Sequence, residues 1–257
     1  MEKIRDRNNL EFRAIIPAAG CSRRLTHLTR DKPKSFLDIN GKKLIEYALD
    51  CLNKKGIRNA TLIVGYKKEQ FIDTIGKKRG GLNIDYVVSE DYETREHGWS
   101  LFLSGESWRK DKKDVLLMDA DNFYEPALLD KLILSEKENV VLVNGAPGKK
   151  EEEEMVVGRN GIVEGLKRGI FEEGKGFAGE FIGMNKFSSE FMEMLYNYME
   201  NYFEEKGPNH KYERVLNDFI RDSGKKVDYI YSGGLRCINI NSEEDYEMAK
   251  ELHRRIK

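Results

Sequence analysis

Two short stretches near the N-terminus combine small residues with cationic ones, a composition suited to binding phosphate. Residues 17–25 read Pro-Ala-Ala-Gly-Cys-Ser-Arg-Arg-Leu and follow an apolar run. Small residues let backbone N–H groups approach phosphate oxygens, and the guanidinium groups of Arg23 and Arg24 add positive charge. Residues 31–37 add Lys34, whose ammonium group would stabilise charge on a leaving pyrophosphate. The two stretches predict a triphosphate site, with ordinary surface turns as the alternative.

Carboxylates follow a later apolar run. Residues 115–122 read Val-Leu-Leu-Met-Asp-Ala-Asp-Asn, so Asp119 and Asp121 come directly after a buried strand. Carboxylates at such a place are costly unless a cation is near, and Mg²⁺ prefers hard oxygen ligands. We therefore predict a Mg²⁺ site here, with capping of the next helix as the alternative. Near the C-terminus Asn239 and Asn241 share one face of a strand, and their amide oxygens can complete a metal shell.

The elements that must position these residues alternate between strand and helix. Short apolar runs predict buried strands at 12–17, 60–64, 84–88, 114–118 and 140–143. Helical spacing of apolar residues predicts helices at 42–55, 69–75, 98–108 and 126–134. Buried strands separated by helices indicate an α/β fold, with a Rossmann-like, mixed but mostly parallel sheet sandwiched by helices.

The pattern changes after residue 147. Alternation punctuated by glycine predicts short strands between 155 and 170, and apolar runs predict strands at 181–184, 227–231 and 237–240. Helices are predicted at 188–205 and 212–221, with a last helix capped by Ser242. The sequence has no repeat and no low-complexity linker. We therefore expect a single domain over residues 1–257, divided into a first half at about 12–145 and an elaborated half at about 146–257.

The composition limits the class of partner. The chain has 44 Lys and Arg against 45 Asp and Glu, so it lacks the basic excess expected of a protein that coats nucleic acid. No run approaches the ~20 apolar residues of a membrane span, and three scattered cysteines indicate free thiols. We expect a cytoplasmic protein with no nucleic-acid partner and no membrane insertion. Charged residues make up 35% of the chain, a proportion found in thermophile proteins, although the plentiful asparagines argue against such a source.

Four motifs have now been described in chain order: the loop at 17–25, the segment at 31–37, the carboxylate segment at 115–122, and the asparagines at 239 and 241. Together they resemble the motifs of the nucleotidyltransferases that act on sugar phosphates and alcohol phosphates. The resemblance is strongest over residues 12–145. The resemblance implies catalytic roles for Arg24, Lys34 and Asp121 and a metal shell of Asp121, Asn239 and Asn241. It also implies that the first half binds the nucleotide, through Ala18, Ala19, Gly20, Cys21, Ser22, Arg23, Arg24, Lys34, Gly98, Ser100 and Asp119. The chain departs from the family at Ser22, where many members have glycine, and at the two asparagines, where related cytidylyltransferases have acidic residues.

Residues 95–101 resemble the cytidylyltransferase version of the family, which implies CTP as donor and Mg²⁺ as cofactor. The implied acceptor is a small phosphorylated alcohol bound by the second half and its neighbours, with contacts expected from Trp99, Asn122, Glu180 and Lys186. The charged composition favours inositol-1-phosphate; phosphocholine, 2-aminoethylphosphonate and a sugar-1-phosphate are the alternatives. A homodimer is one expectation for the assembly.

Two other interpretations stay open at this point. Asp119-Ala120-Asp121 matches the Asp-x-Asp metal motif of glycosyltransferases, although a nucleoside diphosphate donor does not need the triphosphate loop. The two asparagines also permit an inactive subunit that binds nucleotide only. The four histidines form no obvious catalytic pair, and His97 is interpreted as an exposed loop residue.

Overall fold

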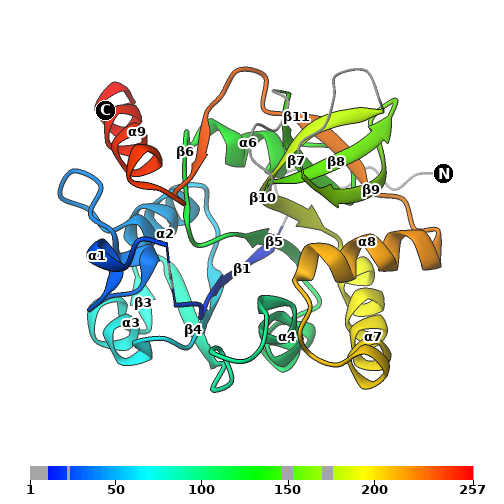
Figure 1. The fold of residues 1–257 in the computed structure, drawn as a ribbon, viewed down its shortest axis with the longest axis horizontal. Helices are drawn as coiled ribbons and strands as arrows, with labels where there is room; N and C mark the ends of the chain where they lie inside the picture. Colours follow the sequence, from blue (N-terminus) through cyan, green and yellow to red (C-terminus); the bar gives the residue numbers. More distant parts are fainter. Residues whose placement is uncertain (1–10, 22–23, 146–152, 170–175, 257) are drawn as a thin grey trace.

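The computed structural model describes residues 11–21, 24–145, 153–169 and 176–256 (Figure 1). Within these residues ten strands form one mixed sheet in the order β3-β4-β2-β1-β5-β10-β7-β11-β9-β8. Four neighbouring strands in it are parallel: β4 (Leu82–Val88), β2 (Asn59–Val64), β1 (Phe12–Ala18) and β5 (Asp114–Met118). The first four predicted strands are therefore confirmed as a parallel core, and the α/β fold with a mixed sheet is confirmed with them.

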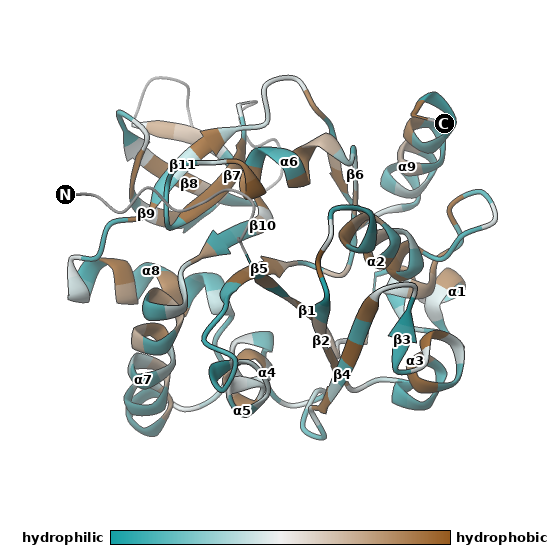
Figure 2. Cartoon of the chain, turned by 180° about the vertical axis from the view of Figure 1, so that it is seen from behind, coloured by the Kyte–Doolittle hydropathy of each residue, from teal (hydrophilic) through white to brown (hydrophobic). Residues whose placement is uncertain are grey.

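The parallel strands β1, β2 and β5 are buried on both faces and separate two hydrophobic cores. Ala14 and Ile16 of β1 point into one core, whereas Ile15 points into the other. The same alternation holds in β5, where Leu116 and Leu117 face opposite ways. Figure 2 shows the apolar colour concentrated on these central strands. Runs without polar residues are the sequence pattern that such doubly covered strands require.

Helices cover both faces of the sheet. One core is covered by α2 (Leu44–Lys54), α3 (Lys68–Ile75), α6 (Ala127–Ile133) and α9 (Glu243–Arg255). The other is covered by α4 (His97–Leu103), α5 (Gly105–Arg109), α7 (Ser189–Lys206) and α8 (Tyr212–Ser223). Two short elements, α1 (Thr26–Thr29) and the 3-10 turn η2 (Lys34–Phe36), follow the first loop.

The continuous helix predicted at 98–108 is broken into α4 and α5. The Ser104 hydroxyl donates to the Leu101 carbonyl at 2.6 Å, and Gly105 follows directly. A serine that binds its own backbone and a glycine both weaken a helix interior. A Cβ on Gly105 would lie 2.1 Å from the Tyr196 ring, so the break also lets α5 pack closely against α7.

The second half adds strands that are mostly antiparallel. β10 (Phe177–Phe187) pairs with β5, β7 (Val140–Asn144) and β8 (Glu154–Arg159). β9 (Ile162–Arg168) and β11 (Asp228–Tyr231) complete the group, and β3 (Lys78–Arg79) forms the far edge of the sheet. β10 is longer than the strand predicted at 181–184, because a register shift between Phe181 and Asn185 surrounds Gly183, which has a φ of 70°. Because of this irregularity, the apolar residues of β10 do not alternate regularly along the sequence, and its full length could not be predicted from such alternation.

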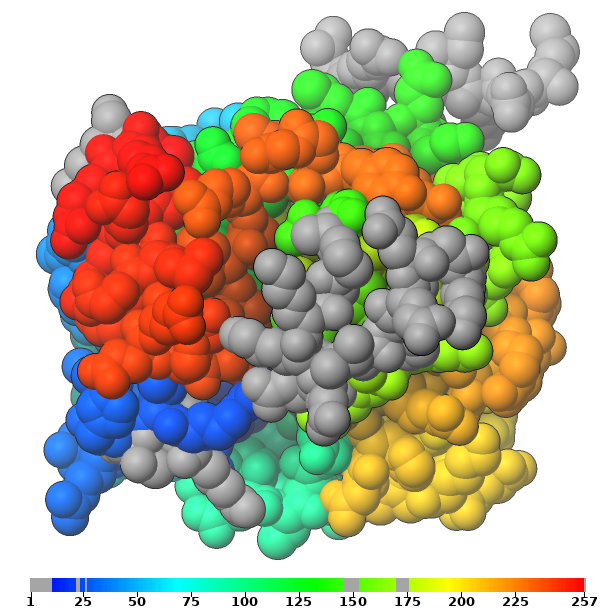
Figure 3. All heavy atoms as spheres, turned by 45° about the horizontal axis from the view of Figure 1, so that its top comes forward, coloured from blue at the N-terminus to red at the C-terminus, as the bar shows by residue number. Residues whose placement is uncertain are grey.

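A small separate sheet joins the end of the chain to the carboxylate segment. β6 (Asn122–Tyr124), which no sequence pattern predicts, pairs with β12 (Cys237–Asn239) and sets Asn122 opposite Asn239. Ser242 then caps α9 together with Asp245, as predicted. The Tyr246 hydroxyl of α9 donates to the Asp38 carbonyl at 2.7 Å, and Figure 3 shows the red C-terminal segment beside a blue segment from the first part of the chain on one face. No helix among the described residues is long and apolar enough to cross a membrane.

Candidate active site

One large cavity opens at the carboxyl ends of β1 and β5. Its volume is about 1020 Å³, and its walls come from both halves of the chain. The loop at residues 17–25, which we call the phosphate loop after its predicted role, contributes Ala18, Ala19, Gly20, Cys21 and Arg24 to the lining. Ser22 and Arg23, which the sequence also assigns to the nucleotide, lie outside the described residues. A cavity of this size can hold a nucleotide and a small second substrate together.

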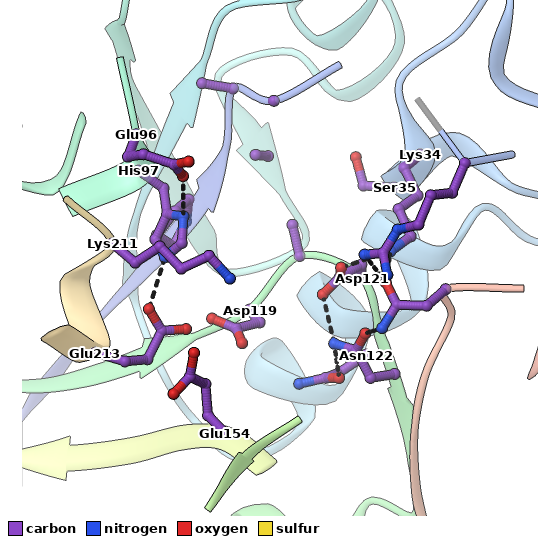
Figure 4. Close-up of a pocket in the computed structure, with 18 of the residues that line it drawn as sticks. Lys34, Ser35, Glu96, His97, Asp119, Asp121, Asn122, Glu154, Lys211 and Glu213 are labelled. Carbon is purple, nitrogen blue, oxygen red and sulfur yellow. Dashed lines mark hydrogen bonds and ion pairs between the residues drawn. The ribbon is translucent and has the colours of Figure 1, made fainter. Parts of the chain in front are cut away.

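At one end of the cavity the predicted catalytic and metal-binding side chains meet (Figure 4). Lys34 Nζ lies 2.7 Å from Asp121 Oδ2 and 2.9 Å from Asn241 Oδ1. Arg24 Nη2 donates to the same Asn241 oxygen at 2.8 Å, and Asn239 Nδ2 donates to Asp121 Oδ1 at 3.0 Å. The five residues come from three distant parts of the chain, and the structure brings all of them together.

Asp121 is held in its ionised form by these contacts. Burial alone would raise the pKa of its carboxyl group, but the Lys34 ammonium and the hydrogen bond from Asn239 outweigh burial and lower it. An ionised carboxylate and two carboxamides offer oxygen ligands of the kind that Mg²⁺ prefers. The donor set therefore fits a divalent cation, with Asp121 and the Asn241 oxygen facing the common space, whereas Asn239 turns its NH₂ group toward Asp121. No group of three or more His, Cys, Asp or Glu side chains elsewhere in the described ranges is arranged to hold a metal.

Ser35 is a cavity residue that the sequence did not single out. It follows Lys34 in η2, and its side chain is 3% exposed. Within the part of the chain that the structure describes, its hydroxyl has no hydrogen-bond partner. A buried hydroxyl at a cavity wall without a partner is available to a ligand atom. No sequence signal distinguishes this serine from the others in the chain.

The segment 97–100 contributes less than the sequence suggests. Ser100 lines the cavity and shares a hydrogen bond of 2.9 Å with Ser89. Gly98 is instead a packing residue, because a Cβ there would lie 2.4 Å from the His210 carbonyl oxygen. Trp99 points away from the cavity: its ring packs on Phe203 with centroids 5.4 Å apart. The structure therefore brings Ser100 to the site but neither of the other two.

Of the residues expected to contact the acceptor, some line the cavity and others do not. Asn122 and Glu180 line the cavity. Asn122 is buried and donates to the Ile182 carbonyl at 2.6 Å while its own oxygen accepts from Asn239 at 3.0 Å, so it fixes the asparagine beside Asp121. Lys186 is not brought to the site, because its Nζ donates to the Ser135 carbonyl at 2.7 Å and its side chain is buried there.

The other end of the cavity carries Asp119, which the sequence assigned to the nucleotide, together with two carboxylates that no motif predicted, those of Glu154 and Glu213. Figure 4 shows Asp119, Glu154 and Glu213 turned toward one another across this end. Tyr212 donates its hydroxyl to Asp119 Oδ1 at 3.0 Å, and Gly183 leaves the room that Asp119 needs, since a Cβ there would lie 1.9 Å from Asp119 Oδ2. Three acidic side chains from distant parts of the chain thus face one space.

Carboxylates and cations both line this end, and Lys211 and Arg168 act on Glu154 against the effect of burial. Burial raises the pKa of Asp119, and the neighbouring Glu213 and Asp121 carboxylates raise it further. Burial and Glu213 likewise raise the pKa of Glu154. The expectation of an exposed loop histidine is wrong, because His97 begins α4 and pairs with Glu213 at 2.8 Å. Burial would lower the pKa of His97, but Glu213 outweighs burial and raises it, so the two side chains form an ion pair whose charges cancel.

Comparison with known proteins identifies the class of protein that this fold and site define. Residues 13–164 match the model of the nucleotidyl transferase family, more than half of the chain, and the chain belongs to that family. It is therefore an enzyme, a nucleotidyltransferase. Nucleotidyltransferases generally use a divalent metal, in agreement with the oxygen donors around Asp121. Membership also argues against the glycosyltransferase and inactive-subunit interpretations.

The similar proteins within the family include enzymes that use CTP. The choline-phosphate cytidylyltransferase of Streptococcus pneumoniae is 38% identical over 112 residues, which span 44% of this chain and 45% of that protein. The solved CTP:phosphocholine cytidylyltransferase from the same organism has a TM-score of 0.75 at 25% identity, covering 95% of this chain and all of the other. The inositol-1-phosphate CTP transferase of T. maritima shares the fold, with a TM-score of 0.73 at 21% identity over 95% of this chain and 97% of its own.

Proposed function

We propose that the protein is a Mg²⁺-dependent cytidylyltransferase that joins CMP to the phosphate of a small acceptor bearing a positive charge. The observation that carries this proposal is the placement of two cations at one end of a single cavity and of a cluster of three carboxylates at the other. Arg24 and Lys34 lie at one end beside the phosphate loop, and the carboxylates of Asp119, Glu154 and Glu213 lie at the other. A nucleoside triphosphate and a cationic acceptor would each meet complementary charge there.

The reaction would be a direct phosphoryl transfer. An oxygen of the acceptor phosphate attacks the α-phosphorus of CTP, the bond from that phosphorus to the bridging oxygen breaks, and pyrophosphate leaves. Arg24 and Lys34 would hold the β- and γ-phosphates and stabilise the charge of the leaving group. A divalent metal at Asp121 and Asn241 would neutralise charge on the α- and β-phosphates. The attacking phosphate is already anionic near pH 7, so the site needs no strong general base.

The acceptor end favours an amine or ammonium over an uncharged ring. Within the described residues, the Glu154 carboxylate has no hydrogen bond and no ion pair at contact distance, although Lys211 and Arg168 act on it from farther away, and the Asp119 carboxylate accepts only from the Tyr212 hydroxyl. A half-buried carboxylate without a cation in contact is costly, and a cationic head group of the acceptor would reduce that cost. The similarity to cytidylyltransferases that act on choline phosphate agrees with this choice.

Inositol-1-phosphate is the second candidate. Arg168 and Lys211 line the same end of the cavity, and cationic donors can bind ring hydroxyls. Lys186, the basic residue that the sequence suggested for the acceptor, donates to the Ser135 carbonyl instead of lining the cavity. The fold that the chain shares with the T. maritima enzyme is compatible with this acceptor but does not favour it over an amine.

Pyrophosphate release tests both substrates. The purified protein would be assayed with CTP, UTP, GTP and ATP, each against phosphocholine, phosphoethanolamine, 2-aminoethylphosphonate, inositol-1-phosphate and glucose-1-phosphate. We expect release with CTP and at least one of the amine-bearing acceptors, at a kcat/KM at least tenfold above that of any other pair. The best rate with UTP and glucose-1-phosphate would reject the proposal, and a best rate with CTP and inositol-1-phosphate would reject the cationic acceptor alone.

Glu154→Gln should weaken binding of a cationic acceptor selectively. The change removes one negative charge from the acceptor end and keeps the size of the side chain, so we expect KM for the amine-bearing acceptor to rise about tenfold, as for the loss of one charged contact. KM for CTP should not change. Glu164→Gln is the matched control, because Glu164 lies on β9 and pairs with Arg159 at 3.5 Å. Equal effects of the two variants, or a changed KM for CTP in the first, would show that Glu154 does not contact the acceptor.

A further inference from the structure

The oxygens that best fit a metal are already engaged by donors in this structure. Asp121 Oδ2 accepts from Lys34 Nζ at 2.7 Å, and Asp121 Oδ1 accepts from Asn239 Nδ2 at 3.0 Å. Asn241 Oδ1 accepts from Lys34 Nζ at 2.9 Å and from Arg24 Nη2 at 2.8 Å. Both cations expected to hold the triphosphate therefore lie on the expected ligands of the metal.

A divalent cation and the Lys34 ammonium cannot use the same oxygens. A metal that approached Asp121 Oδ2 with Lys34 in place would meet a like charge at contact distance, where Coulomb repulsion is largest. One carboxylate also gives a weak site, because Mg²⁺ loses its water reluctantly. Lys34 is well placed to neutralise this carboxylate, since the Lys34 side chain is 13% exposed and that of Asp121 is 29% exposed.

Lys34 can leave Asp121 only if another anion receives it. Its four-carbon stem is flexible, and it lines the cavity beside the phosphate loop. A triphosphate in that loop carries more negative charge than Asp121 alone. We propose that Lys34 is a counter-ion that keeps the metal site closed, and that an arriving triphosphate draws it away from Asp121 and opens the site. The inference rests on the proposed function only in requiring a triphosphate ligand.

The proposal makes metal and triphosphate binding mutually dependent. If the triphosphate removes the obstacle to the metal, then by thermodynamic linkage the metal tightens triphosphate binding by the same factor. Without a triphosphate the protein should bind metal poorly, although every ligand side chain is present. Removing the Lys34 charge should therefore create a metal site in the nucleotide-free protein.

Binding of Mn²⁺ tests this without turnover. Electron paramagnetic resonance would follow free Mn²⁺ against wild type, Lys34→Met and the control Lys32→Met, all without nucleotide. Lys32 lies two residues away in the same segment, and it is not among the described residues that line the cavity. We expect Lys34→Met to bind Mn²⁺ at least tenfold more tightly than wild type, and the control to match wild type. Equal affinity in wild type and Lys34→Met would overturn the proposal, and so would equal tightening by both variants.

A second measurement uses the wild-type protein, so it does not depend on how the variant folds. Mn²⁺ binding to the protein would be measured with added inorganic tripolyphosphate and, separately, with a CTP analogue that has a methylene between the α- and β-phosphates. The Mn²⁺ that each compound binds in the absence of protein would be measured as a control. We expect tripolyphosphate alone to tighten Mn²⁺ binding to the protein at least tenfold, because the counter-ion responds to phosphate and not to the base. No tightening by either compound would overturn the inference. Tightening by tripolyphosphate without selective binding of the CTP analogue would uphold it and reject CTP as the donor.

Discussion

Asp121→Asn is expected to reduce turnover by about a hundredfold to a thousandfold while leaving the fold intact. Asp121 supplies the one carboxylate in the expected metal shell, and removal of a group that stabilises transition-state charge costs about 10² to 10³ in rate even where other ligands remain. Asparagine keeps the size of the side chain and one acceptor for Asn239. The measurement is pyrophosphate release at saturating metal, with a thermal melt of the same preparation.

The melt should change little. The ion pair of Asp121 with Lys34 is partly exposed, with side-chain exposures of 29% and 13%, so its loss should cost no more than about 1 kcal/mol. Asp130→Asn is the matched control, because Asp130 pairs with Lys55 at 2.6 Å on the surface of α6. The control should retain full activity. A rate for Asp121→Asn within tenfold of wild type at saturating metal would remove Asp121 from the metal shell.

The part of the site that could be predicted from the sequence is the part set by local motifs on parallel strands. The phosphate loop follows β1, and Asp121 follows β5, two neighbouring strands whose carboxyl ends lie at the same edge. In such sheets ligands bind outside those ends, so small residues and carboxylates there indicate a site before any coordinates exist. Asn239 and Asn241 came within reach of prediction because of their alternation, although their partner strand β6 was not predicted.

The acceptor end could not be predicted, for a physical reason. Glu154, His97 and Glu213 come from three elements far apart in sequence, and each is an ordinary charged residue in its own segment. Only the packing of α8 against α4 brings His97 to 2.8 Å from Glu213. A side chain's direction is equally invisible in a sequence. Trp99 and Lys186 are neighbours of site segments along the chain, yet their side chains are used in packing and in a hydrogen bond to Ser135.

Asn239→Asp is expected to tighten metal binding and to destabilise the metal-free protein. In the structure Asn239 Nδ2 donates to Asp121 Oδ1 and to Asn122 Oδ1, both at 3.0 Å. A carboxylate in its place loses both donated bonds and sets a second negative charge beside Asp121. We expect the free energy of unfolding in chelator to fall by about 1 to 3 kcal/mol, and the Mg²⁺ concentration for half-maximal rate to fall about tenfold, because added ligand charge raises metal affinity.

The loss of stability should depend on pH with a defined sign. Burial and the Asp121 charge would raise the pKa of the new carboxyl group in the folded state above the ordinary aspartate value of about 3.9. A raised acid pKa means that the penalty is complete above the folded-state value and disappears as pH falls toward the unfolded one. Thermal melts in chelator from pH 8 down to pH 5 should therefore show the deficit of Asn239→Asp shrinking as the pH falls.

Asn241→Asp separates the effect of position from that of charge. Asn241 Oδ1 accepts from Lys34 Nζ at 2.9 Å and from Arg24 Nη2 at 2.8 Å, so a carboxylate there would face two cations. Both variants add one negative charge to the metal site, and both should lower the Mg²⁺ requirement. Only Asn239→Asp should lose stability in chelator, since the carboxylate at 241 gains attraction from Lys34 and Arg24 that offsets its lost donation to Asn239. If the two variants lost equal stability in chelator, the charges of Lys34, Arg24 and Asp121 would not determine the stability of the metal-free protein in the way the structure implies.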